Sequence, residues 1–368
     1  MNVVKISFLL PSYPLAPVGG FRVIYEYANY LVSRNHDVVV IHVSAFNAPH
    51  STPSWLAQAE EAGLRFMYRA IARSNVPVVH WQHIDKRIRM IFLGREPLER
   101  EIPDGDAIFA TAWSTANNVW HYSRSKGIKC YLIQHWETWA GPENDVKATW
   151  LLPLHKVVIS EWLYELGKEL GATNIVHIPN AIDHNTFQIL NSMETRKPSI
   201  LSLYHKAEWK GVRDAVSALQ LLHESHPEIP VTFFGSPKRG SDLPSWVNYV
   251  RNPSQTALVN LYNTHAIYLG ASWTEGWALP PAEAMACGCA FVGTDIGGYK
   301  DYAQHHNTAL LSPPRDPTVL FENLLKVVED DDLRHSLQVN GHALIQKFTW
   351  KQSGYLLEQW LESELIES

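Results

Sequence analysis

Residues 265–288 read HAIYLGASWTEGWALPPAEAMACG, and this stretch holds the pattern that decides the fold. HAIYLGASW predicts a buried strand, TEGW predicts a loop, and PPAEAMACG predicts a short helix that begins at proline and ends at glycine. A strand followed by a helix is the repeating unit of a parallel sheet. The stretch therefore predicts an α/β fold, with Glu275 in the loop and Glu283 in the helix.

The same alternation extends in both directions along the chain. An apolar strand at 3–10 is followed by Gly19 and Gly20, an amphipathic helix at 21–35 and a second strand at 37–44. These elements form a β-loop-α-β unit, and similar units make each half of the chain a doubly wound parallel sheet. Further strands are expected in the segments 107–113, 129–135, 155–159, 199–205, 230–235, 246–253, 265–272 and 289–295.

The length of 368 residues exceeds the size at which one hydrophobic core usually stops growing. The polar segment NSMETRKP (191–198) lacks a hydrophobic period and is placed at the domain boundary. We expect residues 1–190 and 191–350 to form two Rossmann-like domains, and 351–368 to form a helix that packs back on the first. Because parallel sheets bind ligands beyond the carboxyl ends of their strands, two facing sheets predict a central cleft.

Composition excludes several classes of protein. With 46% hydrophobic and 18% charged residues, the chain has an ordinary globular composition, and its net charge of -6 argues against a nucleic-acid partner. Three cysteines are too few for a disulfide framework, which suits a reducing compartment. No stretch approaches the roughly 18 apolar residues of a membrane span, and MNVVKISFLLPSYP suits a buried strand better than a signal peptide. We expect a cytoplasmic protein.

Two interpretations of the acidic pair follow from its spacing. Glu275 lies just before the predicted helix and Glu283 about one turn inside it, so both can face one cleft. Carboxylates accept hydrogen bonds from sugar hydroxyls, and exposed amides at a helix start bind anions, so the pair suits a ligand that combines both groups. The alternative is that Glu283 only complements the helix dipole and Glu275 is a solvated loop residue. Spacing alone supports the two interpretations equally.

The motif EGWALPPAE, continued by AMACGCAFVGTDIGG, resembles the paired-glutamate signature of family 4 retaining glycosyltransferases. Residues 14–41 resemble the glycine loop and first helix of that family, and 176–187 resemble its interdomain signature through Asn180, Asp183 and Phe187. The resemblance implies the GT-B architecture, with two Rossmann-like domains facing a central cleft and the nucleotide-sugar donor held mainly by the second. It also implies transfer with retention of configuration, without a metal or other cofactor.

The resemblance assigns roles in donor binding to particular residues. Glu275 is expected to contact hydroxyls of the transferred sugar, and Glu283 to bind the ribose hydroxyls. Four backbone amides after Glu275 are expected to hold the sugar and the diphosphate. These amides belong to Gly276, Trp277, Ala278 and Leu279.

The phosphate-binding pair departs from the family pattern. In SLYHKAEWKG (202–211), Lys210 and Gly211 match a Lys-Gly pair whose lysine neutralises the diphosphate. The family usually has an arginine five residues earlier, but His205 occupies that position and Lys206 follows it. A neutral histidine cannot bind phosphate as a guanidinium does. Either Lys206 substitutes for the arginine, or the donor diphosphate is held more weakly.

Other expected contacts come from more distant segments. Gly19 and Gly20 would let the backbone approach the phosphates from the first domain, the alternative being a tight turn. Pro253, after a predicted strand, falls where the family binds the base through backbone groups. His135 ends a strand of the first domain and is expected to meet the sugar or acceptor, or to transfer a proton. Trp136 is assigned to acceptor binding, although core packing explains it equally well.

We therefore predict a retaining hexosyltransferase that uses Glu275, His135 and Lys210 in catalysis. It would transfer a hexosyl or deoxyhexosyl group from a nucleoside-diphosphate sugar to a hydroxyl of a glycan, lipid-linked or small-molecule acceptor. The segments 102–116 and 131–139 resemble bacterial rhamnosyltransferases more weakly, which favours a rhamnosyl donor. The alternatives are a phosphorylase or epimerase of the same architecture, or a non-catalytic subunit that binds a sugar nucleotide.

Two further patterns have simple structural interpretations. The acidic pairs at Asp104 and Asp330 suit a turn and a helix cap better than a metal site. The basic run DKRIRMIFLGR (85–95), with Arg65, Arg69 and Arg73, suits a solvated face better than contact with an anionic lipid surface at the inner face of the membrane. We keep weak peripheral membrane contact as the alternative.

Overall fold

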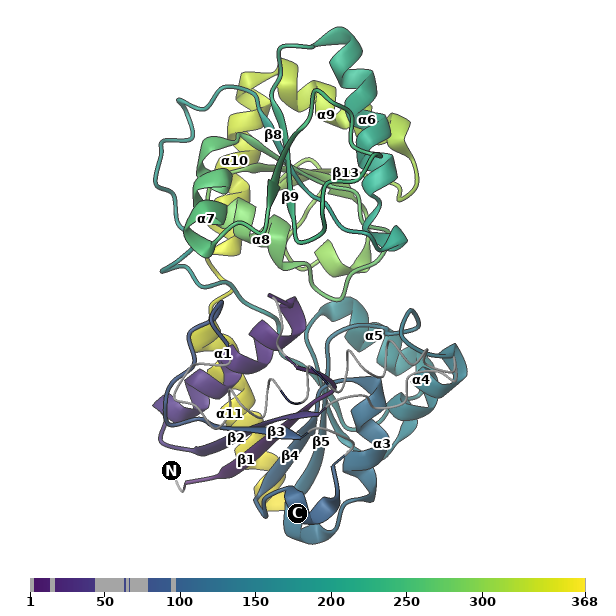
Figure 1. Cartoon of the computed structure of the whole chain (residues 1–368), viewed down its shortest axis with the longest axis vertical. Coiled ribbons are helices and arrows are strands. Elements are labelled where there is room, and N and C mark those ends of the chain that lie inside the picture. The colour runs from purple at the N-terminus through teal and green to yellow at the C-terminus, as the bar shows by residue number, and fades with distance from the viewer. Residues whose placement is uncertain are drawn as a thin grey trace. The chain divides into compact units, whose positions relative to one another are not determined.

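The computed structural model describes residues 3–13, 17–43, 63, 66, 79–93 and 97–367. The chain divides into two compact units (Figure 1): unit 1 comprises Met1–Pro179 and Trp350–Ser368, and unit 2 comprises Asn180–Thr349. Each unit contains one parallel sheet covered by helices. The predicted α/β class with two doubly wound sheets is therefore confirmed.

Unit 1 contains seven parallel strands in the order β3-β2-β1-β4-β5-β6-β7. Strand formation follows from runs rich in β-branched apolar residues, such as VVVI within DVVVIHV, which suit a sheet that is buried on both faces. The elements are β1 Lys5–Leu10, α1 Gly19–Ser33, β2 Asp37–Val43, β3 Arg89–Leu93, η1 Glu99–Glu101, β4 Ala107–Ala110, α3 Trp113–His121, η2 Arg124–Lys126, β5 Ile128–Ile133, α4 Glu143–Leu151, β6 His155–Val158, α5 Glu161–Leu170, β7 Ile175–His177 and α11 Trp350–Glu367.

Part of the basic run forms an edge strand. Residues Arg89–Leu93 are β3, which pairs in parallel with β2 at one edge of the sheet. Charged side chains on an edge strand discourage pairing with another chain, which accounts for part of this run without a lipid ligand. Arg65, Arg69, Arg73 and 94–96 lie outside the described residues.

The last helix packs on the first. Glu358 of α11 is almost fully buried, and its carboxylate accepts hydrogen bonds from Tyr30 Oη at 3.0 Å, Arg34 Nε at 3.2 Å and His36 Nε2 at 3.1 Å. His36 Nδ1 accepts from the backbone N–H of Val4 at 3.1 Å, so Nε2 carries the proton that is donated to Glu358. These donors satisfy the buried carboxylate and tie the C-terminal helix to unit 1.

A buried histidine lies at the carboxyl end of β2. His42 Nδ1 lies 2.9 Å from Ser12 O, which can only accept, so Nδ1 donates and Nε2 accepts from Tyr25 Oη at 3.0 Å. The imidazole stacks on Phe92 with ring centroids 5.1 Å apart. Burial lowers the pKa of His42 to about 4. The neutral ring is therefore part of the native structure of unit 1.

This histidine should make the stability of unit 1 sensitive to acid. Between pH 6.5 and 4 the unfolded chain binds a proton at His42 and the native chain does not, so the free energy of unfolding falls as the pH falls. The loss is expected to reach about 3 kcal/mol. His42→Gln can keep one donor and one acceptor but cannot ionise, so urea unfolding at pH 7 and pH 4.5 should show a smaller loss in this variant. Equal losses in both proteins would contradict the prediction.

Unit 2 contains six parallel strands in the order β10-β9-β8-β11-β12-β13. In this unit α6 packs against α9, and α8 packs against α10. The unit continues after the last strand that the sequence predicts, at 289–295, with strand β13 and helix α9. The elements are β8 Ile200–Leu203, η3 Glu208–Lys210, α6 Val212–Ser225, β9 Val231–Gly235, β10 Asn248–Arg251, α7 Gln255–Thr264, β11 Ile267–Gly270, α8 Leu279–Ala286, β12 Ala290–Thr294, η4 Gly297–Tyr299, β13 Ala309–Ser312, α9 Pro317–Glu329 and α10 Asp331–Ile345.

The division between the units falls at Pro179, ahead of the segment 191–198 that the sequence favours as a boundary. A buried side chain of unit 2 holds part of the intervening chain. The Asn263 amide accepts from the backbone N–H of Leu190 at 2.7 Å and donates to Gln188 O at 3.0 Å. Within the polar segment, the buried Arg196 donates to Asn191 O at 2.9 Å and to Cys287 O at 2.8 Å, so a segment without a hydrophobic period can belong to a compact unit.

Candidate functional site

The candidate site lies where two loops of unit 2 leave neighbouring strands. β8 and β11 are adjacent in the sheet, although β9 and β10 lie between them in the sequence. The chain turns to opposite sides after these two strands, which makes this the topological switch point where open α/β sheets bind ligands. The loop after β8 carries Lys210, and the loop after β11 carries Glu275.

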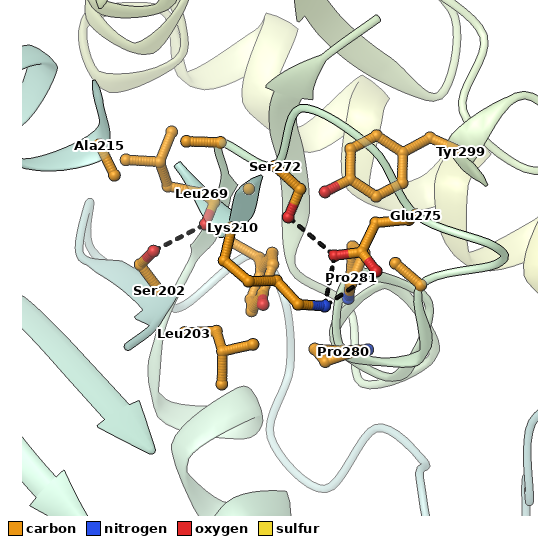
Figure 2. A pocket seen from close by; sticks show the side chains of 14 residues that line it. Ser202, Leu203, Lys210, Ala215, Leu269, Ser272, Glu275, Pro280, Pro281 and Tyr299 are labelled. Atoms are coloured by element: carbon orange, nitrogen blue, oxygen red, sulfur yellow. Dashed lines mark hydrogen bonds and ion pairs between the residues drawn. The ribbon is translucent and has the colours of Figure 1, made fainter. Parts of the chain in front are cut away.

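Lys210 and Glu275 form an ion pair at this point (Figure 2). Lys210 Nζ lies 2.6 Å from Glu275 Oε1 and 2.8 Å from Oε2, and Ser272 Oγ donates to Oε1 at 2.8 Å. The lysine side chain is 21% exposed and the glutamate side chain 11%, so the pair is shielded from water but reachable. The structure thus brings together two residues that the sequence predicts from separate motifs.

The backbone at Gly211 explains why a glycine follows Lys210. Its φ of 62° lies in the left-handed region, and a Cβ at this position would lie 1.8 Å from Ala271 O. A side chain is therefore excluded by both backbone conformation and space. The glycine lets the loop of Lys210 approach the loop of Glu275 closely.

Lys210 and Glu275 help to line a small pocket (Figure 2). The cavity volume of about 20 Å³ is enough for about one water molecule. A sugar or phosphate group is larger, so it would meet Lys210 and Glu275 at the mouth of the pocket. The lining residues are Ser202, Leu203, Lys210, Ala215, Tyr268, Leu269, Gly270, Ala271, Ser272, Glu275, Ala278, Pro280, Pro281 and Tyr299.

The second glutamate has a different environment. Glu283 lies one turn inside α8, is 3% exposed, and accepts from Tyr262 Oη at 3.1 Å through Oε2. Burial and the nearby Glu283 carboxylate raise the pKa of Tyr262 well above its usual value, so its hydroxyl stays a donor. The structure places Glu283 largely inside unit 2, whereas Glu275 lies at the mouth of the pocket.

The amides after Glu275 are less exposed than the sequence suggests. Gly276, Trp277, Ala278 and Leu279 are all buried, and the Ala278 N–H donates to Gly298 O at 3.4 Å. The expectation of an exposed amide is therefore wrong for Ala278. The reason is the short helix η4, whose backbone approaches this loop so closely that it supplies an acceptor.

The Trp277 side chain is a buried anchor of the same loop. Its Nε1 donates to Asp301 Oδ2 at 3.1 Å, and its ring meets Tyr302 edge-on with centroids 4.8 Å apart. Tyr302 Oη in turn donates to Ala278 O at 2.8 Å. These contacts fix the start of α8 beside Glu275.

His205 lies near the ion pair but stays neutral. Its Nδ1 accepts from the backbone N–H of Ala207 at 3.0 Å. Burial lowers the pKa of His205, and the Lys210 charge lowers it further, while Glu275 acts in the opposite direction. This position cannot supply the charge of the missing arginine at neutral pH. Lys206 is exposed beside it, as the substitution hypothesis requires.

Pro253 follows β10 and is half-buried. The preceding Asn252 has a φ of 46° and donates its N–H to Gly235 O at 2.9 Å, and the following Ser254 caps α7 through Ala257 N at 3.2 Å. Backbone groups thus shape this turn at the carboxyl ends of β9 and β10. The predicted role in base binding stays a prediction.

In unit 1 the glycine pair differs from the prediction. Gly19 and Gly20 form the first turn of α1, whereas the sequence predicts a loop before a helix that begins at residue 21. Gln134 Nε2 donates to Gly20 O at 3.1 Å, and a Cβ on Gly20 would lie 3.4 Å from Gln134 Oε1. The first turn of α1 therefore packs against the residue that follows β5 through the Gly20 backbone.

His135 and Trp136 lie just after β5, which ends at Ile133, two residues before the strand end predicted at His135. His135 Nδ1 lies 3.0 Å from Trp136 O, and its ring meets the rings of Trp139 and Trp162 edge-on, each with centroids 6.3 Å apart. Trp136 packs edge-on against the buried Trp150 at 5.6 Å. Core packing accounts for one face of Trp136, and acceptor contact stays a prediction for both residues.

Sequence reasoning missed Ser272 and Glu137. Ser272 orients the Glu275 carboxylate, and no local motif marks it. Glu137 Oε2 accepts from the N–H of Trp113 at the start of α3, at 2.7 Å, and burial raises the pKa of Glu137 to about 7. The only signal was its place in the same segment as His135, and packing rather than sequence sets its ionisation.

Asp330 has the predicted role of a helix cap, whereas Asp104 forms an ion pair in place of the predicted turn. Asp330 Oδ1 accepts from Leu333 N at 2.8 Å and caps α10, while Asp104 pairs with Lys126 at 2.7 Å. Within the described part of the chain, no group of three or more His, Cys, Asp or Glu side chains could hold a metal ion. Among the same residues, no helix is long and apolar enough to cross a bilayer.

The sequence of unit 2 is similar to the sequences of known enzymes. A family profile described as "Glycosyl transferases group 1" matches residues 187–343. The chain is 30% identical over 115 residues to the probable sucrose-phosphate synthase 3 of Arabidopsis thaliana, a match that covers 30% of this chain and 11% of that protein. The matched segments span between 11% and 40% of the length of that protein and of three other curated glycosyltransferases.

Solved structures match almost the whole chain. A sucrose-phosphate synthase from Thermosynechococcus elongatus matches with a TM-score of 0.76 and 16% identity, covering 99% of this chain and 100% of that one. Anabaena HepE in complex with UDP and glucose matches with a TM-score of 0.73 and 14% identity, covering 98% and 100%. At such identities the likeness concerns the fold alone, and the expected GT-B fold is confirmed.

Proposed function

We propose that this chain, which has a GT-B fold and whose residues 187–343 match the group 1 glycosyl transferase profile, transfers a glycosyl group from a nucleoside-diphosphate sugar to an acceptor hydroxyl. The observation that carries the proposal is the Lys210–Glu275 pair, held by Ser272 at the switch point of unit 2. A cation beside an oriented carboxylate matches a ligand that joins a diphosphate to a sugar with free hydroxyls.

The roles in the reaction follow from charge. As the bond between the sugar and the diphosphate breaks, negative charge develops on the leaving phosphate, and Lys210 and the N-terminus of α8 would stabilise it. Glu275 would accept hydrogen bonds from hydroxyls of the transferred sugar and hold it in place. We favour retention through front-face attack, in which a phosphate oxygen of the leaving group accepts the proton of the acceptor hydroxyl. No carboxylate of the motifs is an evident nucleophile.

The identity of donor and acceptor is a finer proposal. UDP-hexoses are natural first candidates because HepE was solved with UDP and glucose, and the rhamnosyl donor rests only on the segments 102–116 and 131–139. Glu283 would bind the ribose, Pro253 would lie beside the base, and His135 and Trp136 would meet the acceptor. The acceptor class is a glycan, a lipid-linked molecule or a small molecule that bears a free hydroxyl.

We further propose a cytoplasmic location with weak contact at the inner face of the membrane. Exposed cations at Lys86, Arg87 and Arg89 support the contact, although Arg87 is already paired with Asp85 at 2.7 Å. Pelleting with anionic and neutral liposomes tests this, and equal partition to both would contradict the membrane contact.

The test of the function is release of nucleoside diphosphate from a panel of UDP-, GDP- and dTDP-sugars, with and without hydroxyl acceptors. We expect slow donor hydrolysis without acceptor, faster release with acceptor, and equal rates in EDTA because Lys210 and the amides rather than a metal would neutralise the diphosphate. Phosphate-dependent glycoside cleavage would favour a phosphorylase, and donor epimerisation would favour an epimerase. Binding without turnover of any donor would indicate a non-catalytic subunit.

A further inference from the structure

Trp273 links the two loops that carry the ion pair. Its backbone N–H donates to Trp209 O at 2.7 Å, which joins the residue two before Glu275 to the residue just before Lys210. Its half-buried indole Nε1 donates to Asp214 Oδ2 at 2.6 Å in the first turn of α6. One residue is thus bonded to the loop of Lys210 and to the helix that follows this loop.

The turn after β13 also contacts the Trp273 side chain. The guanidinium of Arg315, in the turn after β13, lies 4.1 Å from the centroid of the Trp273 ring. Arg315 has a φ of 64°, a left-handed conformation that costs free energy for a residue with a side chain. Its cation–π contact with an indole is the strongest class of such contacts. The strained turn therefore aims a cation at the face of Trp273.

From these contacts we propose that Trp273 is a positioning residue that fixes the distance between Lys210 and Glu275, and that Asp214 and Arg315 hold its indole in place. The inference rests on the proposed glycosyl transfer. Glu275 lies two residues after Trp273. Lys210 lies directly after Trp209, whose carbonyl oxygen accepts the hydrogen bond from Trp273 N–H. A rotation of the Trp273 indole would therefore displace both loops. The Trp273 indole resists such rotation because its Nε1 is bonded to Asp214 and its face is covered by Arg315.

The geometry of the ion pair gives this constraint a consequence for the reaction. The two groups act on different parts of one donor, Lys210 on the diphosphate and Glu275 on the sugar, so stabilisation of the transition state depends on their separation. A misplacement of about 1 Å in such a site can cost about a hundredfold in rate. Binding of a nucleoside diphosphate alone depends on Lys210 and much less on the separation. Loss of Trp273 contacts should therefore lower kcat more than nucleotide affinity.

The test compares variants that differ by one contact. Trp273→Phe keeps the ring but loses the donor to Asp214, and Asp214→Ala loses the acceptor, whereas Asp214→Asn can still accept through Oδ1. Arg315→Gly removes the cation and suits the left-handed backbone. Trp120→Phe, at an exposed tryptophan of α3, is the matched control. Donor turnover, affinity for the nucleoside diphosphate and the midpoint of thermal unfolding are measured for each.

We expect kcat to fall about 10- to 100-fold in Trp273→Phe and Asp214→Ala, with nucleoside-diphosphate affinity within about threefold of wild type. Asp214→Asn and Trp120→Phe should retain turnover, and Arg315→Gly should lower kcat without lowering the unfolding midpoint. Unchanged kcat in Trp273→Phe overturns the inference, as does a loss of activity that matches the unfolded fraction. A wild-type chain that turns over no donor overturns the proposed function itself, which separates the two failures.

Discussion

Lys210→Met is expected to lower donor turnover by about 10²–10³-fold, because it removes the cation that would stabilise the leaving diphosphate. The methionine keeps most of the apolar stem, so the packing of the side chain is largely preserved. Removing the cation also leaves the Glu275 carboxylate, 11% exposed, without the partner at 2.6 Å. The affinity for free nucleoside diphosphate should fall together with kcat. Steady-state turnover and calorimetric binding measure the two effects.

A control and a companion variant make this result specific. Lys168→Met removes another lysine from an ion pair, but Lys168 and Glu165 are each 52% exposed and 3.4 Å apart, so little change is expected in stability or turnover. Glu275→Gln should also lower turnover, yet in combination with Lys210→Met it should recover stability lost by the single lysine variant. Full turnover in either Lys210→Met or Glu275→Gln would show that the ion pair is not the reaction site.

Gly298→Ala is expected to lower turnover about 100-fold and to destabilise unit 2 by about 1–3 kcal/mol. A Cβ on Gly298 would lie 2.5 Å from both Cβ and the carbonyl oxygen of Glu275, and 2.7 Å from its carbonyl carbon. None of these atoms belongs to the flexible end of a side chain. The loop that carries Glu275 or the short helix η4 must therefore move, and the hydrogen bond from Ala278 N to Gly298 O moves with them.

The matched control is Gly63→Ala, at an exposed glycine whose added Cβ would meet no atom of the described residues within 4 Å. Donor turnover and urea unfolding are measured for both variants. If Gly298→Ala is destabilised but turns over donor normally, the approach of η4 supports only the fold. Wild-type stability together with normal turnover would show that the loop tolerates the added atom.

Much of the fold follows from short-range patterns. The apolar run of β2 and the strand-loop-helix stretch around Glu275 predict their elements, because apolar runs and the proline and glycine that bound a helix are properties of neighbouring residues. Predictions failed where packing overrode the pattern. Gly19 and Gly20 form the first turn of α1, where Gln134 binds the Gly20 backbone, and the chain before residue 199 belongs to unit 2, where Asn263 binds the backbone of Leu190.

The candidate site divides in the same way. Sequence motifs were enough to find Glu275, Glu283 and Lys210, because a motif consists only of residue types and their local spacing. Their separate environments could not: Glu283 is almost fully buried against Tyr262, whereas Glu275 lies with Lys210 at the mouth of a pocket. Such differences depend on atoms from other segments of the chain, as Gly298 beside Glu275 and Tyr262 beside Glu283 show.

By itself, the sequence determined the α/β class, most of the strands, and the two charged residues of the candidate site. Only the tertiary structure decided that Lys210 and Glu275, 65 positions apart, form one ion pair. The physical reason is the strand order, which places β8 beside β11 although β9 and β10 intervene in the chain. The same order brings Trp273 onto Asp214 and Arg315, contacts that no local pattern encodes because each partner follows a different strand.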